Sequence, residues 1–421
     1  MLPAVILFAL TYLLMLALPR FRAHVALVSA ACFIFSGMLP FGDVVGSIDF
    51  NVIMMIAGTM GIVSLFIESR MPMLLADIII EKTPNVRWAI VALALFAGII
   101  SAFVDNVATV LMVAPVALAI AKRLDLSPVP MIISIAVSSN LQGAATLVGD
   151  TTSILLGGYA NMNFIDFFVY QGKMGMFFIV QIGAVISAIV LLWLFRKESS
   201  PIVSSQRAVV TDYFPSILLL GMIVLLIIAS FLPNMPSCIN GLICDALLLI
   251  GLLRSVIKTG SLKVVGDVFK EIDWQTILLL TGLFMVIGGI RACGVIDALA
   301  QFIAGLGNGN VFIIYTIIVW ASVLLSAFID NIPYVATMLP VAQGIAASMG
   351  IDPTLLYFGL LSGATLGGNL TPIGASANIA GIGILRKAGF EVKNTDFLRI
   401  GIPFTLSAVI PAYIIIWLLF A

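Results

Sequence analysis

Charged residues are scarce in this 421-residue chain: Asp, Glu, Lys and Arg make up 10% of it, whereas hydrophobic residues make up 62%. Soluble domains carry about a quarter charged residues. The composition therefore excludes an ordinary water-soluble protein and predicts a polytopic membrane protein. The formal net charge is zero, so the chain has no basic surplus for nucleic acid, and we expect it not to bind nucleic acid.

Sequence signatures of catalysis are also missing. The chain has one histidine, no G-x-x-x-x-G-K-[ST] loop and no H-E-x-x-H motif, which argues against zinc proteolysis and against ATP-driven pumping without a partner ATPase. The four cysteines show no metal-ligand spacing. No nucleophile and base pair is evident, so we expect no enzyme activity and no cofactor beyond a coupling ion.

Apolar runs long enough to cross a bilayer, roughly 17 to 25 residues, dominate the chain. We place them at about residues 3–19, 24–41, 51–68, 129–158, 174–195, 214–231, 237–257, 275–292, 354–385 and 400–420. The first run lacks a preceding basic region and a cleavage site, so we expect it to be a retained helix. Amphipathic surface helices are expected at 71–83 and 295–306.

Two further apolar stretches, residues 87–121 and 311–347, are each too long for one helix and are interrupted by an Asp-Asn pair. The first reads SAFVDN around Asp105 and Asn106, and the second reads SAFIDN around Asp330 and Asn331. Each stretch is either a pair of full spans or a hairpin that turns back near mid-membrane.

The matched pairs belong to a longer internal repeat. Ile48-Asp49-Phe50 returns as Ile272-Asp273-Trp274, and Gly58 returns as Gly282, both 224 positions later. Each half has five spans plus one interrupted stretch, and an odd number of crossings inverts the second half. The sequence thus predicts an all-α polytopic membrane protein with two inverted repeats, 1–200 and 201–421, about ten spans, two re-entrant hairpins and two broken helices.

Basic residues are distributed very unevenly between the loops. With these spans, eighteen of the twenty Lys and Arg residues fall on one face, and only Lys173 and Arg291 fall on the other. The positive-inside rule makes the first face cytoplasmic. We therefore expect both termini to be extracytoplasmic, in the inner membrane of a bacterial or archaeal cell.

Carboxylates at mid-membrane cost about 2.5–3.5 kcal/mol on insertion scales, so Asp105 and Asp330 require compensation by water or a bound cation. A purely structural alternative is that they cap the helices that follow them. In a combined arrangement, Asn106 and Asn331 cap while the aspartates face a cavity. Two other charges in the spans, Asp245 and Arg291, are expected to form a structural ion pair.

Gly, Pro and polar residues interrupt the spans at 129–158 and 354–385, which predicts unwound segments that line a cavity. The alternative is close packing through small residues, but it leaves the polar side chains unexplained. The candidate binding residues here are Asn140, Thr146, Asp150, Thr151, Thr152 and Ser153 in the first half, and Asn369, Thr371, Ser376 and Asn378 in the second.

The stretches SAFVDNVATVLMVAPV, GAATLVGD, SAFIDNIPYVATMLPV and GGNLTPIGASANIAG resemble the ion transporter superfamily. The similar branch joins arsenite permeases, NhaD-type sodium–proton antiporters and the melanosomal P protein, and is related to citrate transporters and divalent anion:sodium symporters. The resemblance implies hairpins at 87–121 and 311–347, broken helices at 129–158 and 354–385, elevator-type movement against a scaffold and a homodimer. Relatives typically read GDPPN where this chain has Asp150 followed by Thr151, Thr152 and Ser153.

We therefore predict a secondary active transporter in the lipid bilayer, coupled to H+ or Na+, of the arsenite-permease or Na+/H+ antiporter type. Na+ is expected at Asp105, Asn106, Asp330 and Asn331. One alternative is a transporter of citrate, a dicarboxylate or an inorganic oxyanion held at helix N-termini. Another alternative is a passive channel or facilitator. An arsenite-type function would add a partner ATPase.

Overall fold

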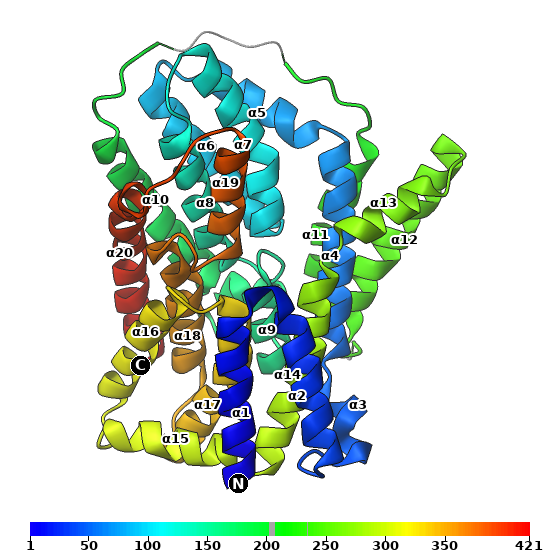
Figure 1. Ribbon diagram of the computed structural model, residues 1–421, viewed down its shortest axis with the longest axis vertical. Helices are drawn as coiled ribbons and strands as arrows, with labels where there is room; N and C mark the ends of the chain where they lie inside the picture. The colour runs from blue at the N-terminus through cyan, green and yellow to red at the C-terminus, as the bar shows by residue number, and fades with distance from the viewer. Residues whose placement is uncertain (202–206, 234) are drawn as a thin grey trace.

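The computed structural model describes residues 1–201, 207–233 and 235–421. In those residues the protein is a bundle of twenty α-helices with one two-stranded hairpin, shown in Figure 1. Eight of the described helices are long and apolar enough to cross a membrane, or up to ten if each of two sharply bent helix pairs is one span. The predicted all-α polytopic fold is confirmed.

The helices follow the predicted spans closely. The first half contains α1 (Leu2–Ala17), α2 (Arg22–Phe35), α3 (Val44–Ser47), α4 (Phe50–Glu68), α5 (Met71–Glu81), α6 (Val86–Ser101), α7 (Asn106–Arg123), α8 (Val129–Gly143), α9 (Thr151–Ala160) and α10 (Met176–Leu194). The second half contains α11 (Phe214–Phe231), α12 (Ile239–Thr259), α13 (Lys263–Glu271), α14 (Trp274–Ala292), α15 (Val295–Leu306), α16 (Val311–Ser326), α17 (Asn331–Met349), α18 (Thr354–Gly367), α19 (Ser376–Lys387) and α20 (Asn394–Phe420).

The interrupted stretches form two helical hairpins, α6 with α7 and α16 with α17, which approach the middle of the molecule from opposite ends (Figure 1). The helix pairs α8–α9 and α18–α19 are the broken helices, with the short 3-10 segment η4 (Gly368–Leu370) inside the second break. Both chain ends lie in the half of the molecule opposite α5 (Figure 1). Their orientation relative to a membrane, and the division into repeats at residues 200 and 201, stay predictions.

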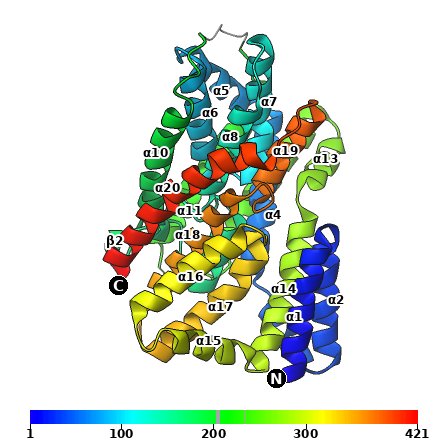
Figure 2. The ribbon, with the colours of Figure 1, turned by 60° about the vertical axis from the view of Figure 1, so that its left-hand side comes forward.

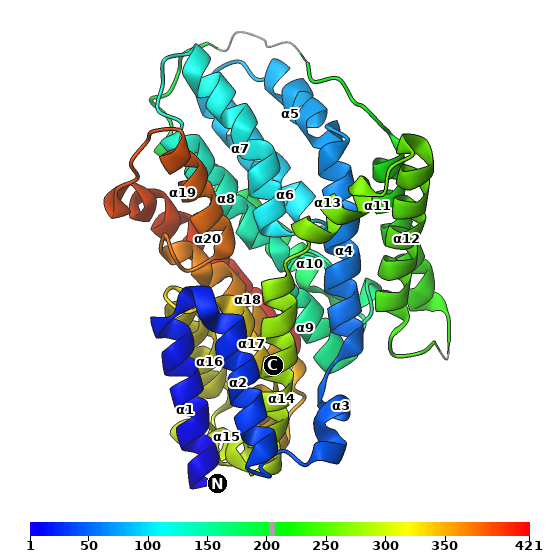
Figure 3. The same ribbon diagram turned by 45° about the vertical axis from the view of Figure 1, so that its right-hand side comes forward.

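Helices at matched positions in the two halves pack in the same way. α4 packs on α12, and α14 packs on α2. Figures 2 and 3 show α1, α2 and α14 side by side, and Figure 3 shows α4, α11 and α12 as a separate group. A Cβ on Gly58 would lie 2.6 Å from the Cys244 carbonyl carbon, and one on Gly282 would lie 2.7 Å from that of Ala26. Only glycine permits both close approaches.

Capping side chains explain why four of the helices begin where they do. Asp49 and Asp273 accept hydrogen bonds from backbone N–H groups at the starts of α4 and α14, and Asn85 and Asn310 do so at α6 and α16. Such side chains satisfy the free donors of a first helical turn. Because these caps recur at matched positions, the repeat in sequence becomes a repeat in helix boundaries.

The structure corrects two of the sequence predictions and adds two elements that were not predicted. α20 begins at Asn394, six residues before the predicted start at 400, because polar residues form its first turns outside the apolar run. Helix α13 and the hairpin of β1 (Val169–Tyr170) and β2 (Lys173–Met174) were not predicted. The expected Asp245–Arg291 ion pair is wrong: Arg291 Nη2 instead donates to Tyr159 Oη at 2.8 Å.

Candidate functional site

The two Asp-Asn pairs lie at the hairpin tips, where each aspartate caps the second arm. Asp105 Oδ2 accepts from the backbone N–H groups of Val107 and Ala108 at 2.9 and 3.1 Å, and Asp330 Oδ1 accepts from that of Ile332 at 3.1 Å. The capping alternative is thus part of the structure. The combined arrangement is reversed, because the aspartates do the capping and the asparagines point elsewhere.

The asparagines join the hairpins to the broken helices. Asn106 Nδ2 donates to Asn140 Oδ1 at 3.0 Å, and Asn140 Nδ2 donates to Asn369 Oδ1 at 3.1 Å. Asn331 Nδ2 lies 3.4 Å from Asp150 Oδ2. All four asparagines and Asp150 are buried, so these bonds form a buried connection between the two halves of the chain.

The unwound segments of the broken helices are fastened to the hairpin tips by equivalent contacts. Thr146 Oγ1 donates to the Ala102 carbonyl and Thr371 Oγ1 donates to the Ala327 carbonyl. Ser153 Oγ donates to the Gly143 carbonyl at 2.9 Å, and Asn378 Nδ2 donates to that of Gly368 at 3.0 Å. Each hairpin and its broken helix therefore make one packed unit.

Glycines at the centre of each unwound segment permit this fastening. A Cβ on Gly149 would lie 2.8 Å from the Gly143 carbonyl oxygen and about as close to the hairpin backbone, and Gly374 has the same surroundings near Gly368. Any side chain at either position would push the segment away from the tip. The glycines that interrupt these two spans in the sequence thus mark places where one backbone segment contacts another.

Asp150 sits where the two halves meet. Its carboxylate caps α9 by accepting from the Thr151 N–H at 2.8 Å, and it accepts from Thr152 Oγ1 at 2.9 Å. Thr152 Oγ1 in turn lies 3.0 Å from Thr365 Oγ1 of the other half. Only 5% of Asp150 is exposed, and that exposed part faces a cavity.

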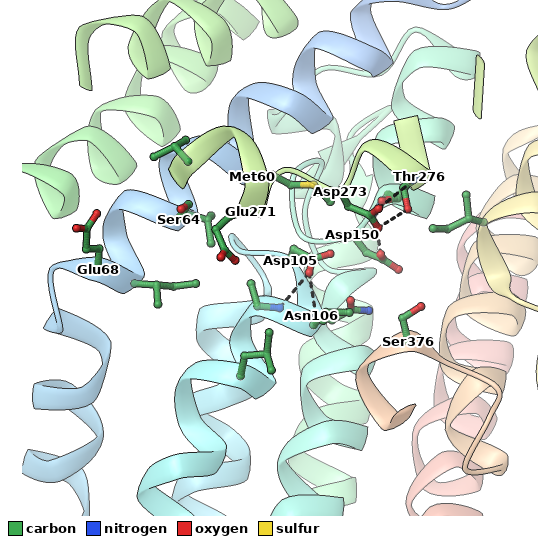
Figure 4. A pocket seen from close by; sticks show the side chains of 18 of the residues that line it. Met60, Ser64, Glu68, Asp105, Asn106, Asp150, Glu271, Asp273, Thr276 and Ser376 are labelled. Atoms are coloured by element: carbon green, nitrogen blue, oxygen red, sulfur yellow. Dashed lines mark hydrogen bonds between the residues drawn. The ribbon is translucent and has the colours of Figure 1, made fainter. Parts of the chain in front are cut away.

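This cavity, which we name the α13 cavity, has a volume of about 410 Å³. Figure 4 shows Asp105, Asp150 and Asp273 directed toward one another across it, with Glu271 close by and Glu68 farther out. Within the described residues its lining contains six carboxylates and no Lys, Arg or His; the six are Glu68, Asp105, Asp150, Asp267, Glu271 and Asp273. Such a lining attracts cations and repels anions.

The predicted site residues separate into two groups. Those that line the α13 cavity are Asp105, Asn106, Asp150, Thr151, Asn331 and Ser376. Those that instead hold the hairpins and broken helices together are Asn140, Thr146, Thr152, Ser153, Asp330, Asn369, Thr371 and Asn378. A binding role for any of them, including Na+ at the tips, stays a prediction.

Sequence reasoning missed four acidic residues of the cavity, Glu68, Asp267, Glu271 and Asp273. A signal for one of them was present, because Asp273 belongs to the repeated Ile-Asp-aromatic motif. Its cap on α14 uses Oδ1 for the Gln275 and Thr276 N–H groups, while Oδ2 accepts from Thr276 Oγ1. The same residue thus starts a helix and lines the cavity.

The two hairpin tips differ in charge balance, which the repeat does not reveal. Arg22 Nη1, at the start of α2, lies 2.8 Å from Asp330 Oδ2. Asp330 is absent from the residues that line the α13 cavity, whereas Asp105 lines it and forms no salt bridge with any described residue. Among the tips, Asp105 is therefore the carboxylate that faces the cavity without a cationic partner.

Comparison with known proteins identifies relatives over nearly the whole chain. The family profile described as "Citrate transporter" (CitMHS) matches residues 12–363. The 46 kDa membrane protein of Mycobacterium leprae is 31% identical over 430 residues, which covers 99% of this chain and 98% of that protein. The human P protein is 26% identical over 437 residues, which covers 86% of this chain and 52% of the P protein.

Two solved transporter structures share the fold at low sequence identity. The Alcanivorax borkumensis YdaH transporter has a TM-score of 0.63 at 14% identity, covering 90% of this chain and 87% of its own. Neisseria gonorrhoeae MtrF, described as illuminating a class of antimetabolite efflux pumps, has a TM-score of 0.54 at 13% identity, covering 91% and 81%. At such identities the likeness establishes the fold alone.

Proposed function

Because this chain belongs to the CitMHS citrate transporter family, we propose that it is a secondary transporter that couples the movement of its solute to H+ or Na+. The chain is an integral membrane transporter and not an enzyme. The superfamily resemblance read from the sequence is confirmed by the family match and by the P protein. The coupling ion, the solute and the movement are the proposed parts.

The charge of the α13 cavity carries this proposal. Six carboxylates and no basic residue line it in the described part of the chain, so the free energy of an empty cavity falls when a proton or a metal cation enters. Asp105 and Asp150 are the best coupling groups. They are the least exposed of the six acidic residues and lie on a hairpin tip and on a broken helix, and Asn331 of the other half lies 3.4 Å from Asp150.

Alternating access follows if the hairpins and broken helices move together. Their mutual contacts join α7, α8, α17, α18 and α19, whereas α4, α13 and α14 contribute the facing wall of the α13 cavity. Movement of the first group past the second would carry Asp105 and Asp150 away from Glu68 and Glu271. We propose this elevator movement, in a bacterial inner membrane with both termini outside; a homodimer and a partner ATPase stay predictions.

A carboxylate solute is the second candidate, favoured by the family description and by the start of α19. No side chain of the described residues caps that helix, and Ser376, its first residue, lines the α13 cavity. Free N–H groups at a helix N-terminus attract an anion. A polycarboxylate would meet strong repulsion from the acidic lining unless protons or a bound cation entered with it.

Purified protein in proteoliposomes with an internal pH dye tests the coupling. Citrate, succinate, arsenite and Na+ are added in turn, with and without an imposed proton gradient. Asp105→Asn and Asp150→Asn keep an acceptor for the helix N–H groups but remove the charge. We expect each variant to abolish solute-coupled proton or sodium movement.

The matched control is Asp245→Asn, which removes an acidic side chain of α12 that does not line the α13 cavity. It should transport like the unmodified protein. Full coupled transport by both Asp105→Asn and Asp150→Asn would contradict the proposed coupling site. Single-channel currents without saturable counterflow would instead indicate the passive channel that the sequence left open.

A further inference from the structure

A second and larger cavity lies at the other end of the molecule. We name it the α3 cavity; its volume is about 1310 Å³, and its lining comes from α3, α9, α14, α17 and the segment before α12. It does not include Asp105 or Asp150. Among its described lining residues, Arg291 is the one basic side chain.

The two cavities are built from matched segments of the repeat. Asp43 and Asp49 line the α3 cavity, and their counterparts 224 positions later, Asp267 and Asp273, line the α13 cavity. The charges differ at the C-terminal ends of α4 and α14. There the α13 cavity has Ile67 and Glu68, whereas the α3 cavity has, at the matched positions, Arg291 and Ala292. One negative charge is thus replaced by apolar surface, and one positive charge is added.

Arg291 is held in place without being neutralised. Its Nη2 donates to Tyr159 Oη at 2.8 Å, and Tyr159 Oη donates to Gln343 Oε1 at 2.5 Å. Asp43 and Asp49 line the same cavity, yet none of the salt bridges in the described residues involves Arg291. The guanidinium is exposed and has five N–H donors, so donors remain for a ligand.

We propose that Arg291, oriented by Tyr159, is an anion-binding site that captures a carboxylate group of the solute in the α3 cavity. The inference rests on the proposed carboxylate solute. Arginine suits this role because its planar donor pair matches a carboxylate, and Tyr159 fixes one edge of that plane. The site lies at the end of the molecule opposite α5 (Figure 1), so solute that enters from that end meets Arg291 before it reaches Asp105 and Asp150.

The unequal charges of the two cavities then give the two membrane faces different affinities for the solute. Among the described residues, two carboxylates and one guanidinium line the α3 cavity, whereas six carboxylates and no base line the α13 cavity. A carboxylate finds a cationic partner, Arg291, at the α3 cavity and none at the more acidic α13 cavity, so it binds more tightly at the α3 cavity, and a cation shows the reverse preference. The solute gradient still sets the direction of net transport. What the charges set is the solute concentration needed for half-maximal transport from each face.

A chemical protection experiment tests the site without requiring transport. Purified protein is treated with phenylglyoxal, which modifies arginine, and the modification of Arg291 is followed by peptide mass spectrometry. We expect citrate to slow modification of Arg291 several-fold and to leave Arg20, an exposed arginine of the α1–α2 turn, unaffected. Protection by none of citrate, succinate or sulfate would overturn the inference.

A transport experiment in vesicles of both orientations tests the role. For Arg291→Gln, the half-saturating citrate concentration at the α3 face should rise about tenfold, the loss of one charged hydrogen bond, and its dependence on ionic strength should weaken. At the α13 face it should change less than twofold. Lys173→Gln is the matched control, because Lys173 is an exposed base predicted on the same face that does not line the cavity.

The two experiments separate failure of this site from failure of the proposed solute. Protection of Arg291 in a protein that moves no citrate would leave the anion site standing and reject citrate as the solute. Citrate transport with an unchanged half-saturating concentration in Arg291→Gln would reject the site and leave the proposed function standing. Equal effects of Arg291→Gln and Lys173→Gln would also overturn the site, since a general surface charge would then explain both.

Discussion

Replacing Arg22 by Gln should destabilise the protein, because it leaves the Asp330 carboxylate largely buried without its cation. The Arg22 Nη1–Asp330 Oδ2 distance is 2.8 Å, and the two side chains are 24% and 14% exposed. At an effective dielectric constant of about 20, Coulomb attraction at that distance is worth about 6 kcal/mol. Desolvation opposes most of it, so we expect a net loss of about 1–3 kcal/mol.

The assay is equilibrium unfolding of the purified protein in mixed micelles, followed by circular dichroism. Arg20→Gln is the control, because Arg20 lies in the same turn, is exposed and forms no salt bridge with a described residue. Adding Asp330→Asn to Arg22→Gln removes the stranded charge and should recover part of the loss, giving a coupling energy in a double-mutant cycle.

The Arg22–Asp330 pair also joins the hairpin of α17, which the elevator proposal moves, to α2, which packs on α14 of the facing group. Tyr12 Oη donates to the Pro333 carbonyl at 2.6 Å and forms a second hydrogen bond with Thr337, so α1 and α2 both hold the α17 hairpin. Equal stability of Arg22→Gln and Arg20→Gln would refute the reasoning, since it would mean that solvent already screens Asp330.

Two further predictions concern stability. The hydrogen bond from Arg254, with that from Lys258, holds the pKa of Asp212 below its usual value. The resulting stabilisation, about 1 kcal/mol for a mostly solvated pair, is present above about pH 4 and is lost as the pH falls toward the lowered folded-state pKa. Asp212→Asn should therefore lower the melting temperature at pH 7, and this difference should shrink progressively as the pH falls below about 4; a difference that stays constant with pH would contradict this. Gly282→Ala places a Cβ 2.7 Å from the Ala26 backbone and should lower the free energy of unfolding by about 1–3 kcal/mol. Its control is Gly266→Ala in α13, which has open space around it and should not lower the melting temperature in the same assay.

Much of the fold was predictable because its determinants are local. Apolar runs fix the spans, since backbone groups inside a bilayer must bond within their own helix. Asp105 and Asp330 mark the hairpin tips because each bonds to N–H groups only two or three residues away. Gly149 and Gly374 mark the unwound segments for a related reason, since only glycine tolerates a neighbouring backbone at that distance.

The candidate site was predictable only in part. Asp105, Asp150 and Ser376 line the α13 cavity as the polar interruptions suggested. Glu271 was not predicted as a site residue, because a glutamate near a helix end in a sequence usually lies on the solvated surface. Its place near Asp105 (Figure 4) depends on how α13 packs against α4, which no local pattern encodes.

The sequence by itself determined the membrane spans, the repeat and the caps, because hydrophobicity and first-turn hydrogen bonds act over a few residues. The tertiary structure alone decided the charge balance of each site. It brought Arg22 to Asp330 across 308 positions, left Asp105 in an acidic cavity and turned Arg291 toward Tyr159 rather than Asp245. Matched sequences therefore gave matched backbones with unmatched electrostatics, because charges interact through space with whatever the fold places beside them.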